Sequence, residues 1–60
     1  MGALEDMFRK RAESNKKTAD QYYAKAKQGE GNSNYGKAKH WYNEAERNRQ
    51  NAEEMKKQNR

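Results

Sequence analysis

Small and apolar residues recur at helical spacing in two segments of the chain. The first segment carries a stripe of seven positions that are three or four residues apart: Leu4, Phe8, Ala12, Asn15, Ala19, Tyr22 and Ala26. The second segment carries a similar stripe: Tyr35, Ala38, Tyr42, Ala45, Arg49, Ala52 and Met55. Because an α-helix turns once in about 3.6 residues, this spacing puts each stripe on one helix face. The pattern predicts two amphipathic helices, over about 3–28 and 35–58.

Residues that end and begin helices lie between the two segments. Residues 28–34 read Gln-Gly-Glu-Gly-Asn-Ser-Asn, and the chain has no proline. Glycine commonly follows the end of a helix, and Asn and Ser are preferred at the N-cap of the next one. The sequence therefore predicts an all-α fold, a two-helix antiparallel hairpin spanning 1–60 with a loop over about 29–34.

The two stripes also predict how the helices pair. If the chain folds back at the loop, residues whose numbers add up to about 64 lie at the same level. The resulting pairs are Tyr22 with Tyr42, Ala19 with Ala45, Asn15 with Arg49, Ala12 with Ala52, and Phe8 with Met55. Large residues then face large ones, so the tyrosines of the stripes, Tyr22, Tyr35 and Tyr42, are expected in the core. The Asn15–Arg49 layer either fixes the register, as buried polar layers do in coiled coils, or lies in solvent.

The second segment is similar to a known repeat family. Its small and aromatic residues resemble the second helix of a tetratricopeptide repeat, and the preceding pair of tyrosines resembles the end of the repeat's first helix. The residues that carry this resemblance are Tyr22, Tyr23, Tyr35, Ala38, Tyr42 and Ala45. The resemblance covers about residues 19–52 and implies a helical adaptor unit that binds proteins. That the sixty residues are one piece of a longer repeat protein also stays open.

Charge widens the range of possible partners. Fourteen Lys and Arg residues against nine Asp and Glu residues give a net charge of +5. The acidic residues are interspersed along both segments, so the excess indicates either a solvated helical surface or a polyanionic partner such as RNA, DNA or an acidic protein. The chain has no cysteine and no long apolar run. We therefore expect a cytoplasmic protein with no membrane partner.

The residues needed for catalysis are scarce. His40 is the single imidazole, and neither Ser14 nor Ser33 has a base at helical spacing. Gly29-x-Gly31 lacks the third glycine and the lysine of a phosphate-binding loop. A two-helix hairpin also has no enclosed pocket in which reactive groups are preorganised. We therefore expect no enzyme activity, no cofactor, no metal and no small-molecule substrate.

Three large apolar residues lie beside the stripes, at Met7, Tyr23 and Trp41. One neighbouring helix cannot cover them together with the stripe, so they are candidate partner-binding residues. They predict a protein-interaction module that binds a partner protein or itself, most simply a homodimer in which two hairpins form a four-helix bundle. Tyr23 and Trp41 either face that partner or form a second flank of the core. For Trp41 we expect partial burial at the edge of the core.

An alternative function is predicted for the loop end. Four lysines bracket the loop, Lys25, Lys27, Lys37 and Lys39, and aromatic residues lie in the same turns. Single-stranded nucleic acid is bound by this combination, with phosphates on lysine and bases stacked on rings. The alternative is therefore a small basic nucleic-acid-binding protein that uses these four lysines.

Overall fold

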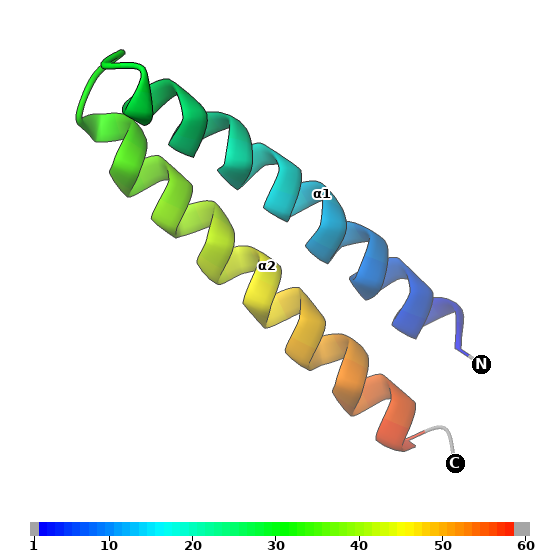
Figure 1. Ribbon diagram of the computed structural model, residues 1–60. Helices are drawn as coiled ribbons and strands as arrows, with labels where there is room; N and C mark the ends of the chain where they lie inside the picture. The colour runs from blue at the N-terminus through cyan, green and yellow to red at the C-terminus, as the bar shows by residue number, and fades with distance from the viewer. Residues whose placement is uncertain (1, 59–60) are drawn as a thin grey trace.

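The computed structural model describes residues 2–58, which form two helices joined by one short loop. Helix α1 spans Ala3–Lys27 and helix α2 spans Ser33–Gln58. Figure 1 shows the two helices side by side and antiparallel, with the start of α1 and the end of α2 at one end and the loop at the other. The Cα atoms extend over 47 × 13 × 10 Å. The predicted all-α antiparallel hairpin is confirmed.

The interface between the helices is built on alanine. The buried apolar residues of the described part are six alanines, with exposed fractions between 0 and 7%: Ala12, Ala19, Ala26, Ala38, Ala45 and Ala52. They are the six alanines of the predicted stripes, which is a confirmed prediction. A methyl side chain allows two helix axes to approach closely. It also buries little apolar area, so the core is narrow and the large side chains lie around it.

The residues that alternate with the alanines in the stripe of α1 face α2 largely as predicted. Phe8, Asn15 and Tyr22 are half-buried between the alanines. Leu4 is the exception, because 54% of its surface is exposed in the first turn of α1. Leu4 of the predicted stripe therefore does not line the core.

In α2, the large residues that face α1 beside the alanines differ from the predicted ones. Tyr35 and Tyr42 are 46% and 37% exposed, so the expectation that these two tyrosines line the core is wrong. Arg49 is exposed, which is the solvent alternative given for its layer. The inward row instead comprises the residues that lie three positions after an alanine or four before one: Asn34, Trp41, Asn48 and Met55. The positions three and four after an alanine point about 100° apart on opposite sides of the alanine row. Trp41 presents more apolar surface than its neighbour Tyr42, and α2 is rotated so that Trp41 faces α1.

The predicted polar layer changes its partner for the same reason. Asn15 of α1 is half-buried, but Arg49 is exposed, and its Nη1 donates to Glu46 Oε1 at 2.6 Å. The half-buried polar residue of α2 is Asn48, whose side-chain amide donates to the carbonyl of Glu44 at 3.1 Å. The amide that occupies the inward row is therefore satisfied within its own helix.

The loop forms a Schellman motif at the end of α1. The N–H of Glu30 donates to the carbonyl of Lys25, and the N–H of Gly29 donates to that of Ala26, both at 3.0 Å. This arrangement needs a residue with left-handed backbone geometry after the helix, and Gly29 has φ +82°. At the other side of the loop, the buried Asn34 amide donates to the carbonyl of Glu30 at 2.8 Å. The side chain of Asn34 thus ties the first turn of α2 to the loop.

Two glycines give a prediction with opposite signs. A Cβ built on Gly29 or on Gly36 meets nothing within 4 Å, so only backbone conformation separates the two sites. Gly29→Ala is expected to lower the free energy of unfolding by about 1 kcal/mol, because alanine is strained at positive φ. Gly36→Ala lies inside α2 and is expected to raise it by about 0.5–1 kcal/mol. Urea unfolding followed by circular dichroism tests the pair, and a change of the same sign in both would contradict the loop geometry.

Candidate partner-binding surfaces

The interface between the helices is bordered by two different edges. Adjacent residues of a helix point about 100° apart, and residues two apart point about 200° apart. The ring of Tyr23 packs against that of Tyr35 with centroids 5.9 Å apart, whereas Lys37 Nζ lies 5.6 Å from the centroid of the Tyr22 ring. These two cross-helix contacts therefore lie on opposite sides of the hairpin. We call the side with Tyr23, Tyr35 and Tyr42 the tyrosine edge, and the side with Tyr22, Lys25 and Lys37 the lysine edge.

The tyrosine edge brings together the three tyrosines that are exposed in the described residues. Tyr23, Tyr35 and Tyr42 are 44%, 46% and 37% exposed. The rings of Tyr23 and Tyr35 meet edge to face at 72°. The Tyr42 hydroxyl donates to Asp20 Oδ1 at 2.5 Å, which links α2 to α1. Three aromatic side chains are thus fixed in place by cross-helix contacts while much of their surface faces solvent.

The hydrogen bond between Asp20 and Tyr42 requires an ionised Asp20 and a protonated Tyr42. The hydrogen bond from Tyr42 lowers the pKa of Asp20, and Lys16, with its Nζ 3.5 Å from the carboxylate, adds to this effect. The same hydrogen bond raises the pKa of Tyr42, because the phenol must keep its proton to donate. The contribution of Asp20 to folding is lost as the pH falls through its lowered pKa, and that of Tyr42 is lost as the pH rises through its raised pKa. The contact therefore supports the fold across the neutral range.

Towards the open end of the hairpin, the tyrosine edge becomes charged. A shallow hollow there is lined by both helices: Arg9, Ala12, Glu13, Lys16 and Arg49. Arg9 also lies 4.0 Å from Glu53 of α2 and 2.8 Å from Glu5 of its own helix. The edge thus changes along its length from exposed tyrosines near the loop to arginine and lysine near the termini.

The lysine edge gathers cations around aromatic rings. Lys25 Nζ and Lys37 Nζ, one from each helix, lie 5.7 and 5.6 Å from the centroid of the same Tyr22 ring. In α2, the exposed ring of His40 meets the half-buried ring of Trp41 at a centroid distance of 5.2 Å and an angle of 79°. This side of the closed end therefore combines two ammonium groups with three aromatic rings.

The ion pairs leave the closed end out. Those of the described residues are Arg9–Glu5, Arg9–Glu53, Lys16–Asp20, Arg47–Glu44 and Arg49–Glu46. Residues 22–42 hold four lysines and one glutamate, a net charge of +3, and none of these five takes part in an ion pair of the described part. Most of the net charge of +5 is thus concentrated around the loop.

The structure brings most of the predicted partner-binding residues to one end. Besides the lysine edge, Lys27 Nζ lies 5.3 Å from the centroid of the Tyr23 ring, and Lys39 is exposed in the second turn of α2. Trp41 is half-buried, but it lies in the inward row of α2 and not beside it. Met7 is separated from this group by more than four helical turns, a distance of about 24 Å from Tyr23 along α1.

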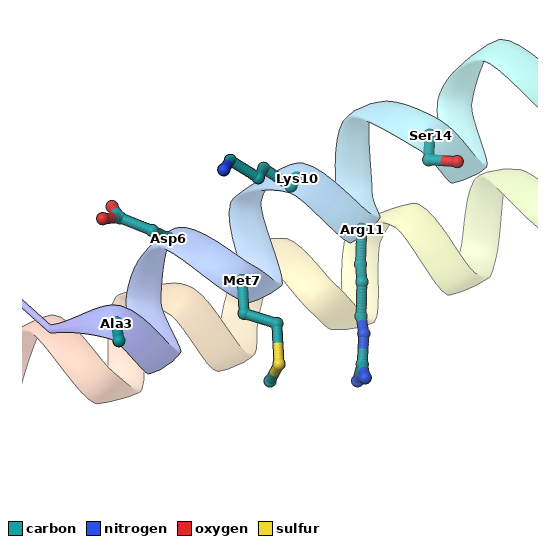
Figure 2. Close-up of a pocket in the computed structure, with 6 residues that line it drawn as sticks. All are labelled: Ala3, Asp6, Met7, Lys10, Arg11 and Ser14. Carbon is teal, nitrogen blue, oxygen red and sulfur yellow. The ribbon is translucent and has the colours of Figure 1, made fainter.

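Met7 borders a hollow formed by α1 alone. Figure 2 shows the residues that line it, Ala3, Asp6, Met7, Lys10, Arg11 and Ser14. Met7 and Arg11 extend to one side of the helix, with Asp6 and Lys10 on the other. A single helix cannot enclose a ligand, so the hollow is an open groove on the surface. The contact between Tyr42 and Asp20, which links the helices on the tyrosine edge, was not predicted, because Tyr42 belongs to the predicted stripe and was expected in the core.

Comparisons with known protein families, curated proteins and solved structures give no match for this chain. Neither α1 nor α2 is long and apolar enough to cross a membrane. Over residues 2–58, no three His, Cys, Asp or Glu side chains are grouped so that they could hold a metal ion. The class that the fold defines is an antiparallel helical hairpin with an alanine interface.

Proposed function

We propose that this hairpin is a non-catalytic protein-interaction module that self-associates through its tyrosine edge. The observation that carries the proposal is the contrast between a buried core of six alanines and three exposed tyrosines beside it. Aromatic side chains supply much of the energy of protein interfaces when they are buried. A second hairpin laid along this edge would cover the rings and form a four-helix bundle.

The shape of the hairpin favours completion by a partner. Its accessible surface is 4730 Å², whereas a compact protein of 7.1 kDa exposes about 4,100 Å². A standard protein interface buries roughly 800 Å² per partner, which is about a sixth of this surface. One long side of a 47 Å hairpin supplies such an area.

The charges along the tyrosine edge favour an antiparallel arrangement of the two copies. A two-fold axis perpendicular to the long axis would set the tyrosines of one copy against the arginines of the other. Arg9 and Arg49 line the charged part of this edge and are suited to stacking on tyrosine rings. A parallel arrangement would set arginine against arginine. The resemblance to a tetratricopeptide hairpin is compatible with this proposal, because such repeats stack on neighbouring hairpins.

Sedimentation equilibrium and circular dichroism over a concentration series test the proposal. The expected result is a mass that rises towards that of a dimer, together with rising helicity. Tyr23→Gln/Tyr35→Gln is expected to weaken association at least tenfold, about 1.4 kcal/mol. Leu4→Gln is the matched control, because it removes a side chain that is 54% exposed and lies at the other end of α1. A monomer of constant helicity at all concentrations would contradict self-association.

A further inference from the structure

We propose that the lysine edge at the closed end of the hairpin binds single-stranded nucleic acid. This activity is independent of self-association, because the proposed dimer uses the opposite edge. The binding groups are the ammonium groups of Lys25 and Lys37 and the rings of Tyr22, His40 and Trp41. Lys27, which lies beside Tyr23 on the tyrosine edge, and Lys39 add positive charge at the same end of the hairpin but are not part of the lysine edge.

The charges of the lysine edge favour a phosphate as ligand. Lys25 Nζ and Lys37 Nζ lie within 5.7 Å of one ring centroid, so they are no more than about 11 Å apart. Glu30 is the one acidic residue between positions 22 and 42, and it forms no ion pair within the described residues. A phosphate bound between them would be attracted by both ammonium groups. Elsewhere on the hairpin, Arg9, Lys16, Arg47 and Arg49 lie beside carboxylates, and the other cations are interspersed with acidic residues along the helices.

The aromatic rings of the lysine edge favour nucleic acid over other polyanions. An acidic peptide or heparin would use the ammonium groups alone, whereas a base can also stack on an aromatic side chain. His40 is exposed, and its ring meets that of Trp41 5.2 Å away. Tyr22 is half-buried with both ammonium groups near its ring. A nucleotide bound here would place its phosphate and its base on neighbouring groups of different chemistry.

The width of the closed end favours a single strand over duplex DNA. The major groove of duplex DNA is about 12 Å wide and admits one helix, whose diameter with side chains is about 10–12 Å. The closed end presents two helices side by side, joined by the loop between Lys27 and Ser33. Two packed helices are too wide for that groove. The unpaired bases of a single strand are accessible to the rings without any groove.

Fluorescence anisotropy tests the proposal. The probe is a labelled single-stranded oligonucleotide of mixed sequence, about 16 nucleotides long, which is the upper end of the site size of one small domain. If two phosphates contact Lys25 and Lys37, affinity falls roughly sevenfold between 50 and 200 mM salt, because the slope is about −0.7 per phosphate. Lys25→Gln/Lys37→Gln is expected to remove most of this salt dependence and to weaken binding at least tenfold at low salt. The matched control is Lys10→Gln/Lys17→Gln, which removes the same charge from the outer face of α1 and should keep the wild-type salt dependence.

Each contrary result is decisive. Equal losses in the two double variants would show diffuse charge attraction and overturn the site. Equal affinity for heparin or for duplex of the same length would overturn the role of the rings and the preference for single strands. Absence of binding at 50 mM salt would overturn the proposal as a whole. Tyr23→Gln/Tyr35→Gln is expected to retain binding within threefold, and its loss of binding would place the site on the tyrosine edge instead.

Discussion

Ala19→Leu is expected to lower the free energy of unfolding by about 3 kcal/mol, a large share of the total stability of so small a protein. Ala19 is 0% exposed and lies at the centre of the alanine row of α1. The three additional carbon atoms of leucine cannot fit at the alanine spacing, so the helices must separate. Separation also costs the dispersion contacts of the neighbouring alanine layers. A protein of sixty residues has a total stability of only about 3–9 kcal/mol.

Ala24→Leu is the matched control in the same helix, because Ala24 is exposed. Leucine and alanine are both good helix formers, so this change should leave the midpoint of urea unfolding nearly unaltered. Circular dichroism at equal protein concentration gives both midpoints. If Ala19→Leu were as stable as Ala24→Leu, close approach of the helices through alanine would not be what holds the hairpin together.

Trp41→Ala is the second change with a large expected effect. Trp41 is the largest residue of the inward row of α2, and its half-buried ring covers the alanine interface near the loop. We expect a loss of about 3 kcal/mol, the lower end of the range for buried aromatic residues, because part of the ring is exposed. The variant should therefore lose helicity even when it is dilute and monomeric.

Tyr42→Ala is the control that tests the rotation of α2. Tyr42 is the next residue along the chain, is 37% exposed and contacts Asp20 at the surface. Its replacement should reduce stability clearly less than Trp41→Ala does. The opposite order would mean that α2 turns Tyr42 towards α1 and that the stripe read from the sequence is the correct one. A Trp41→Ala variant that keeps its helicity but no longer associates would instead place Trp41 in the contact with a partner.

At the closed end, the sequence predicts which lysines come together but not which aromatic rings they border. The lysines bracket the loop in the sequence, so any hairpin brings Lys25 and Lys37 to the same end. The sequence does not reveal that both ammonium groups border the ring of Tyr22, nor that Tyr23 belongs to the opposite edge. That division follows from the 100° step between adjacent residues once the direction of the interface is known.

The sequence by itself determined the two helices, the loop and the alanine rows. Helical spacing, the glycine after the first helix and the seven-residue spacing of Ala12, Ala19 and Ala26 are local properties that do not depend on the partner helix. Tertiary structure alone decided which large residues accompany those alanines. Trp41 and Tyr42 lie on either side of the alanine row, so the same periodicity fits both. Whether Trp41 or Tyr42 faces α1 depends on how much apolar area stays exposed in each of the two rotations of α2 about its axis. That area is a property of the packed pair of helices.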